Sequence, residues 1–168
     1  MLRWKHEKDE DFETQHIGRR ANGLVSDIAW AASHAETYDI DQLIDLSAMT
    51  PEEIYRFAPD YLWIEPGDSI RFLNSTGNHT VTSLEGMWPE GADYIDIEHL
   101  PEAKVVLDKP GIYGFRCKVH GRHGMYALVV VGTPEPNIDQ IEYGKVSDVG
   151  KQIFEKLFAK MEEDWKEK

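Results

Sequence analysis

The sequence predicts an all-β Greek-key sandwich with C-terminal α-helices and an N-terminal extension. Many short apolar runs are separated by turns that contain Pro or Gly. A stripe of apolar residues at three- and four-residue spacing comes near the C-terminus, and the first residues are densely charged. With 168 residues and 41% hydrophobic content, the chain is large enough to bury one core. We therefore expect one domain with appendages.

Residues 1–35 are expected to form the N-terminal extension, either disordered or acting as a docking arm. Up to about Arg20 this part is polar and highly charged, as is typical of a tail. The short apolar stretch that follows ends in small residues and resembles an export signal. Asp27 lies within that stretch and favours an amphipathic helix, or a strand extension packed on the domain, instead. His6 and His16 lack partners at the spacing of a metal site.

Residues 36–134 are expected to form the β-sandwich. Polar and apolar residues alternate over Thr37–Leu46, which predicts a first strand with one buried face. Thr50 followed by proline predicts the start of a short helix. Pro66-Gly67 and Pro110-Gly111 predict turns between strands. The other predicted strands are 61–64, 69–73, 79–84, 103–107, 111–116 and 126–131.

Residues 135–168 are expected to form helices that pack on the sandwich. Asn137 predicts the N-cap of a short helix that ends at Tyr143. Ser147 predicts the N-cap of a longer helix that runs to about Trp165. Apolar residues line one face of this longer helix, which indicates a packing surface. They are Val149, Ile153, Phe154, Leu157, Phe158, Met161 and Trp165.

One segment carries the residue types of a metal centre. Cys117 is the only cysteine of the chain, and His120 and Met125 follow it closely. The strand 111–116 would end at Cys117, a glycine-containing loop would carry His120, and Met125 would begin the next strand. His79 would come across from another strand. A thiolate, two imidazoles and a weak thioether are the ligands of a blue-copper electron-transfer site.

Two alternatives compete with a copper site at these residues. A single cysteine beside a strand is commonly a small buried hydrophobe, and a methionine at a strand start commonly belongs to the core. Zinc is the main competing metal. The combination of Cys-x-x-His, a methionine at Met125 and Asn-His-Thr-Val upstream favours copper over a tetrahedral structural zinc site.

The sequence from about Phe57 to Met161 resembles the pseudoazurins, a family of small periplasmic cupredoxins. The matching segments are 65–72, 78–81, 86–92, 109–115, the loop after Cys117 and the C-terminal helical segments. The resemblance implies a cupredoxin fold, one type 1 copper per chain, and a one-electron carrier rather than an enzyme. It also implies a periplasmic location and redox partners such as reductases or cytochromes. The implied copper ligands are His79, Cys117, His120 and Met125.

The resemblance also implies roles for residues around the copper. In the family the second histidine ligand reaches the surface, so we expect His120 to be the electron port. Backbone N–H groups near Asn78 and in the loop are expected to donate hydrogen bonds to the sulfur. Val119 stands where the family usually has proline, and it adds an N–H near the metal. His123 stands where an apolar residue is common, either as a surface histidine or as a pH switch beside the copper.

Partner docking is expected at the copper end of the molecule. In the family, the turn that matches Met87 and Trp88 lies near the copper and helps to form an apolar face. Lys118 and Arg122 would lie near the port. Family members often present lysines around this face, whereas the comparable loops here are acidic. We therefore expect weak, fast, salt-sensitive docking to a different partner. The acidic residues are Glu85, Glu90, Asp93, Asp96 and Glu98.

Composition argues against several other functions. The formal net charge of −13 disfavours nucleic-acid binding, and no apolar run is long enough to span a membrane. A subunit or domain of a multicopper reductase or oxidase is the alternative function, but it needs a second copper centre. A copper storage protein usually presents several exposed Met or Cys ligands, whereas this chain has one Cys. The remaining histidines, which form no H-x-H cluster, are His6, His16, His34, His99 and His123.

Overall fold

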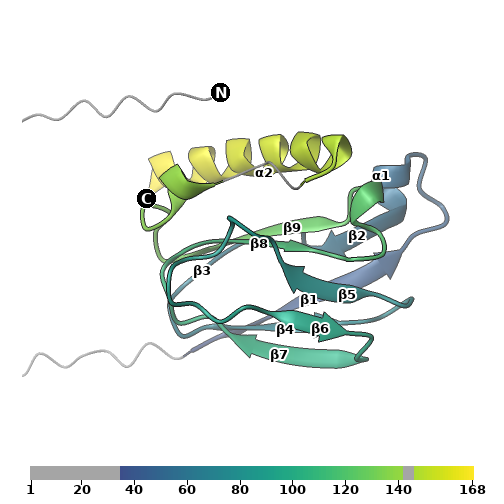
Figure 1. Ribbon diagram of the computed structural model, residues 1–168, viewed down its shortest axis with the longest axis horizontal. Helices are drawn as coiled ribbons and strands as arrows, with labels where there is room; N and C mark the ends of the chain where they lie inside the picture. The colour runs from purple at the N-terminus through teal and green to yellow at the C-terminus, as the bar shows by residue number, and fades with distance from the viewer. Residues whose placement is uncertain (1–34, 142–145) are drawn as a thin grey trace, which may run out of the picture. The chain divides into compact units, whose positions relative to one another are not determined.

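The computed structural model describes residues 35–141 and 146–168, so the predictions for residues 1–34 lie outside the described part. Two β-sheets pack face to face, and one long helix covers the second sheet (Figure 1). The strand order is β2-β1-β4-β7 in the first sheet and β3-β9-β8-β5-β6 in the second. The elements are β1 (Thr37–Ile44), α1 (Pro51–Ile54), β2 (Tyr55–Ala58), β3 (Tyr61–Ile64), β4 (Ser69–Leu73), β5 (Thr80–Ser83), β6 (Asp96–Glu98), β7 (Glu102–Val106), β8 (Gly111–Arg116), η1 (Gly121–His123), β9 (Tyr126–Val131), η2 (Ile138–Gln140) and α2 (Asp148–Glu167).

The predicted sandwich with a C-terminal helix is confirmed, and both sheets are mixed rather than purely antiparallel. β1 runs parallel to β4, and β3 runs parallel to β9. The remaining pairs are antiparallel, among them β5 with β8 and β8 with β9. These two pairings bring the start of β5, the end of β8 and the start of β9 together at one end of the second sheet.

Two short strands were not predicted from the sequence. β2 follows α1 directly, where only a helical turn and its exit were expected. β6 has three residues within an acidic stretch, and two of them are exposed. Only Ile95 and Ile97 alternate with acidic residues around β6, which is too short a run to predict a strand, and β6 is stabilised by its backbone pairing with β5.

The apolar run of β9 is buried on both faces. Ala127, Val129 and Val131 lie in the core between the two sheets, whereas Leu128 and Val130 lie in a second core beneath α2. A strand that is covered on both faces requires a continuous apolar run rather than alternation. This explains the uninterrupted sequence from Tyr126 to Val131.

The helix α2 packs on the outer face of the second sheet through its predicted apolar stripe. The side chain of Ser147 accepts a hydrogen bond of 3.1 Å from the N–H of Gly150, so the predicted N-cap is confirmed. In the part of the chain that the structure describes, no helix is both long and apolar enough to cross a bilayer. The buried side chains of α2 are Phe154, Leu157 and Met161.

The N-cap role predicted for Asn137 is wrong. The helix that follows it is a three-residue 3₁₀ helix, Ile138–Gln140, to which Asn137 makes no side-chain cap. Instead, Asn137 Oδ1 accepts from the N–H of Ile112 and Nδ2 donates to its carbonyl, both at 2.8 Å. β5 pairs with β8 only at Phe115 and Arg116. The buried Asn137 therefore supplies the hydrogen bonds that a neighbouring strand would supply at Ile112.

We expect Asn137→Ala to destabilise the fold, because it leaves the N–H and C=O of Ile112 without these partners. The expected loss of unfolding free energy is about 2–3 kcal/mol, measured by urea denaturation of the copper-free protein. Asp139→Ala, at an exposed neighbouring position, is the control and should change the unfolding free energy by less than about 0.5 kcal/mol. Equal stability of the two variants would contradict the role assigned to Asn137.

Candidate metal centre

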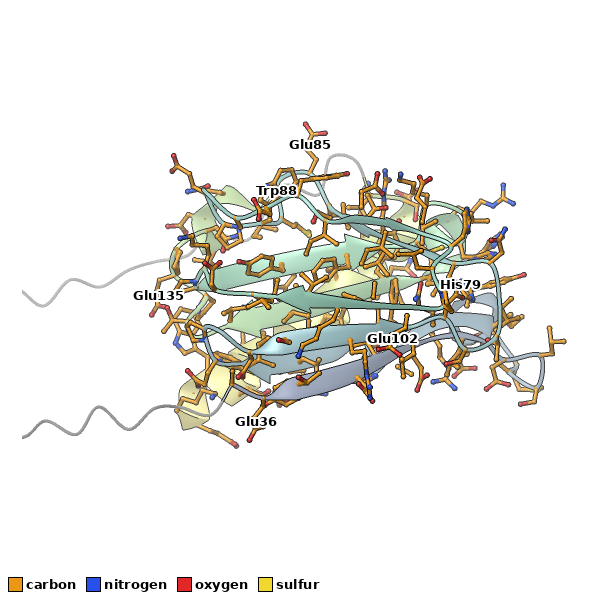
Figure 2. All side chains as sticks on the ribbon, turned by 90° about the horizontal axis from the view of Figure 1, so that it is seen from below. Glu36, His79, Glu85, Trp88, Glu102 and Glu135 are labelled. Carbon is orange, nitrogen blue, oxygen red and sulfur yellow. The ribbon has the colours of Figure 1, made fainter. Side chains whose placement is uncertain are left out.

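Three of the four predicted ligands meet at one end of the sandwich. Among residues 35–141 and 146–168, the cluster of potential metal ligands consists of His79, Cys117 and His120. Cys117 Sγ lies 4.0 Å from His79 Nδ1 and 3.7 Å from His120 Nδ1, and the two Nδ1 atoms are 3.0 Å apart. Figure 2 shows His79 at the end of the sandwich opposite Glu135.

The loop between β8 and β9 fixes the backbone of Cys117 and His120. The N–H of Cys117 donates to the carbonyl of Met125 at 3.1 Å, and the N–H of Gly121 donates to the carbonyl of Cys117 at 2.8 Å. Gly124 ends the 3₁₀ helix of the loop with a left-handed φ of 103°, a conformation that favours glycine. Because the two ends of the loop are bonded to each other, the ligands on it have little freedom to move.

His79 reaches the cluster from the neighbouring strand. It directly precedes β5, which pairs with β8 at Thr82 opposite Arg116. Its side chain is 1% exposed, and burial lowers the pKa of His79. The imidazole is therefore held in the neutral form, which is the form that binds a metal.

The donor atoms suit a metal ion such as copper. Bonds of about 2.0 Å to nitrogen and about 2.3 Å to sulfur, spread roughly 120° apart, place two nitrogens about 3.5 Å apart and a nitrogen and a sulfur about 3.7 Å apart. The observed nitrogen–nitrogen separation is 3.0 Å, and the two observed nitrogen–sulfur separations are 3.7 and 4.0 Å. One thiolate and two imidazoles in a buried site are the main donors of a blue-copper centre. The residues present therefore fit this metal.

Met125, the fourth predicted ligand, is tied to the other two loop ligands through its backbone. Its N–H donates to the carbonyl of His120 at 3.4 Å, and its carbonyl accepts from Cys117. Its side chain is fully buried in the same core as Cys117. An axial thioether ligand at this position remains a prediction.

The ring of His120 packs against an aromatic side chain that the sequence did not reveal. Tyr55 of β2 stacks on it with ring centroids 4.2 Å apart and an interplanar angle of 9°. The ring of His79 meets it edge-on, at 4.8 Å and 66°. His120 is half-buried whereas His79 is buried, so His120 is the histidine of the cluster that reaches the surface. No signal marked Tyr55, because the contact joins distant segments through an unpredicted strand.

The sulfur of Cys117 is surrounded by hydrogen-bond donors. Burial is the largest influence and opposes ionisation, but backbone N–H groups of Thr80, His120 and Val119, together with the Thr80 hydroxyl, outweigh it. The pKa of the Cys117 thiol is therefore lowered, which favours the thiolate that binds a metal.

The donors to the sulfur include backbone N–H groups near the predicted positions and one hydroxyl that was not predicted. Val119 and His120 lie in the predicted loop. Asn78 itself is exposed, and the donor on its side of the cluster is Thr80. A hydroxyl residue directly after His79 was the available signal, because Ser and Thr readily donate hydrogen bonds to nearby groups.

The docking role predicted for Met87 is wrong. Its side chain is fully buried in the core beneath α2 and packs directly against Gly114 of β8. A buried side chain offers no surface to a partner. Trp88 is half-buried and packs edge-on against Tyr94. Figure 2 shows Trp88 well separated from His79, so this turn does not form a face beside the metal cluster as predicted.

Lys118 lies beside the cluster, but its charge is already paired. Its Nζ lies 2.8 Å from a carboxylate oxygen of Asp96 and 2.7 Å from one of Glu98. Hydrogen bonds to these two carboxylates raise the pKa of Lys118 to about 12. The lysine therefore stays charged at neutral pH, while its nearest surroundings are neutral or negative overall.

The remaining predicted residues border the loop. Arg122 is exposed, and its Nε donates to Nε2 of His123 at 3.0 Å. The ring of His123 lies 5.3 Å from that of Tyr55, and Val119 is 45% exposed. A docking role for Arg122 and a pH-switch role for His123 remain predictions.

The sequence is similar to known copper proteins over most of the sandwich. Residues 45–132 match the family described as copper binding proteins, plastocyanin/azurin family. A pseudoazurin of Methylorubrum extorquens is 39% identical over 106 residues, which are 63% of this chain and 72% of that protein. A putative pseudoazurin of Rhizobium leguminosarum bv. viciae is 29% identical over 126 residues, or 75% of this chain and 83% of that protein.

Solved structures agree with this similarity. The crystal structure of pseudoazurin from Methylobacterium extorquens AM1 has a TM-score of 0.67 and 33% identity, and it covers 74% of this chain and 98% of its own. A Sinorhizobium pseudoazurin has a TM-score of 0.67 and 29% identity, with 76% of this chain and 97% of its own covered. Sequence, fold and ligand cluster agree: this chain belongs to the plastocyanin/azurin family of copper-binding proteins and, within it, to the pseudoazurins.

Proposed function

We propose that the protein carries single electrons between redox partners, with one type 1 copper held by His79, Cys117, His120 and Met125. The observation that carries the proposal is the convergence of three donor atoms, all within 4.8 Å of one another, on a hydrogen-bonded and largely buried frame. Membership of the family supports copper as the metal. Copper bound here would supply a centre that accepts and releases one electron.

The residues of this chain contribute a frame that resists rearrangement. Cys117 and Met125 are fully buried in the core between the sheets, and His79 is 1% exposed. Densely packed side chains move little, and the ring of Tyr55 stacks on the ring of His120 and limits its motion. Donor atoms held in this way keep the structural change that accompanies each electron small, which favours rapid transfer.

The difference in exposure between the two histidines indicates which of them an electron would pass through. His79 is buried, whereas His120 is partly exposed beneath Tyr55. The loop that leads from β1 towards Tyr55 carries Leu46 and Met49, which are 87% and 92% exposed. We assign His120 as the port, with these apolar side chains available for a transient contact with a partner.

The overall charge of the chain favours a basic partner. The chain has a formal net charge of −13, and Lys118 is paired with Asp96 and Glu98. Complementary charge speeds encounter and makes it salt-dependent. A periplasmic reductase or cytochrome with a basic surface is the partner that we propose, with the location following from the pseudoazurin resemblance.

A domain of a multicopper reductase or oxidase is less well supported. Such an enzyme requires a second copper centre in addition to the electron-transfer site. In the part of the chain that the structure describes, the metal-ligand cluster is the one at His79, Cys117 and His120. Binding of more than one copper per chain would favour this alternative.

Cys117→Ser tests the proposed function most directly. We expect the wild-type protein to bind one copper and to show an intense sulfur-to-copper visible band that bleaches reversibly on reduction. The variant should lose this band because serine has no sulfur donor. Absorption and EPR spectra measure the effect, and urea denaturation of the copper-free variant verifies that the fold persists. An intense band that survives in the variant would refute Cys117 as the ligand.

Met125→Leu tests the axial position. We expect the variant to keep copper and colour and to have a higher reduction potential, because loss of a weak sulfur donor favours the less charged reduced ion. Voltammetry measures the potential. Met161→Leu, in the core beneath α2, is the matched control and should leave the potential unchanged. If both variants had the wild-type potential, Met125 would not be an axial ligand.

Gly77→Ala tests the packing behind His79. A Cβ at this position would lie 2.9 Å from His79 Nε2 and 2.7 Å from Ile44 Cδ1, so the imidazole ring must shift. We expect weaker copper binding and an altered charge-transfer spectrum, measured by copper titration. Asn78→Ala, at the exposed next position, is the control and should bind copper as the wild type does. Unchanged copper affinity in the Gly77 variant would show that the His79 ring is not confined from this side.

A further inference from the structure

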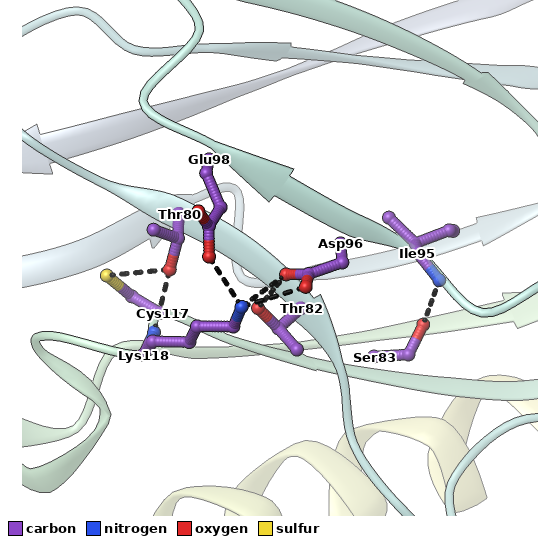
Figure 3. A network of polar contacts seen from close by, with 8 residues as sticks. All are labelled: Thr80, Thr82, Ser83, Ile95, Asp96, Glu98, Cys117 and Lys118. Atoms are coloured by element: carbon purple, nitrogen blue, oxygen red, sulfur yellow. Dashed lines mark hydrogen bonds and ion pairs between the residues drawn. The ribbon is translucent and has the colours of Figure 1, made fainter.

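The hydroxyl of Thr80 lies between the Cys117 sulfur and the residue that follows it (Figure 3). Thr80 Oγ1 is 2.8 Å from the backbone nitrogen of Lys118 and 3.7 Å from Cys117 Sγ. Thr80 is 2% exposed and Cys117 is fully buried, so water does not readily replace either bond. This contact forms no part of the ligand set.

The chemistry of the three groups fixes the direction of both hydrogen bonds. The backbone N–H of Lys118 can only donate, so the oxygen of Thr80 accepts it. The hydroxyl has a single proton, and a thiolate at Cys117 can only accept. The O–H of Thr80 is therefore directed to the sulfur.

The side chain of Lys118 anchors the residue whose N–H donates to Thr80. Its ammonium bridges Asp96 and Glu98, which lie on β6. In the pairing of β6 with β5, Glu98 is opposite Thr80 and Asp96 is opposite Thr82. Thr82 Oγ1 also donates to Asp96 at 3.1 Å. Lys118 is thus bound through its ammonium to the strand beside Thr80 and through its N–H to Thr80 itself.

We propose that Thr80 and Lys118 are positioning residues for the Cys117 sulfur. The ion pairs of Lys118 hold its N–H against the Thr80 oxygen, and this directs the Thr80 hydroxyl to the sulfur. The hydrogen bond withdraws electron density from the thiolate and weakens its donation to bound copper, which raises the reduction potential. The inference rests on the proposed function, and it gives Lys118 a role in tuning the metal site rather than in docking.

The hydrogen bond is tested first in the copper-free protein. Thr80→Val keeps the shape of the side chain but removes the hydroxyl, so the Lys118 amide loses its acceptor. We expect its hydrogen exchange, followed by NMR, to become about threefold to tenfold faster. Thr80→Ser keeps the hydroxyl and should restore the wild-type rate. Unchanged exchange in Thr80→Val would overturn the proposed contact.

The tuning role is tested in the copper-loaded protein. We expect Thr80→Val to lower the reduction potential and to move the sulfur-to-copper band to longer wavelength, because the thiolate becomes a stronger donor. Thr80→Ser should have wild-type values of both. A wild-type potential in Thr80→Val, together with faster Lys118 exchange, would overturn the tuning role. A wild-type protein without the visible band would instead contradict the proposed function. The exchange result in the copper-free protein would still test the hydrogen bond independently.

The role of Lys118 is tested by combining two variants. Lys118→Met should lower the potential even at high salt, where surface charge effects are screened. Lys104→Met removes an equal charge from an exposed position on β7 and should leave the potential unchanged at high salt. If Lys118 acts through Thr80, its substitution should cause no further shift in the Thr80→Val background. Additive shifts, or equal shifts in the two lysine variants, would overturn this link.

Discussion

The backbone hydrogen bonds within the loop from Cys117 to Met125 are the constraint on which the metal end of the molecule depends. They close the loop between β8 and β9, so that the thiol, the imidazole of His120 and the thioether all come from one short, rigid segment. The pairing of β8 with β9 continues to the base of this loop, with Arg116 opposite Tyr126. The paired strands thus restrict the motion of the proposed ligands on this loop, and only His79 comes from another segment, directly before β5.

The two hydrophobic cores of the protein pack against different parts of the metal end. The core between the sheets surrounds Cys117 and Met125, and the core beneath α2 supports the opposite face of β9. Tyr126 belongs to the second core and packs edge-on against Phe154 of α2 at 5.4 Å. The C-terminal helix therefore buttresses the strand that begins directly after Met125, although it lies on the other side of the sheet from the ligand sulfur.

A chain of polar contacts runs from the buried Cys117 sulfur to charged side chains at the surface. Thr80 contacts Cys117 on one side and Lys118 on the other, and Lys118 continues to the carboxylates of β6. A lysine beside the port does not by itself make that face basic. In the proposed function, the exposed apolar side chains and the overall negative charge would define the surface that a partner meets, whereas the ammonium of Lys118 is paired with Asp96 and Glu98.

The sequence by itself determined the features that depend on local spacing. The Cys-x-x-His segment with Met125, the strands on either side of it, the continuous apolar run of β9 and the Ser147 cap all follow from residues that are close together in the chain. Local spacing fixes them because hydrogen bonds and side-chain periodicity within a few residues leave few alternatives.

Only the tertiary structure decided the features that depend on which strands become neighbours. The approach of His79 to within 4.0 Å of Cys117 Sγ, the stacking of Tyr55 and the hydroxyl contact of Thr80 arise from pairing between distant segments. The same holds for the two misjudged side chains: Asn137 pairs with Ile112 rather than with its own helix, and Met87 is buried against Gly114. Register and packing across a sandwich are set by the whole set of strands at once, so no single stretch of sequence carries them.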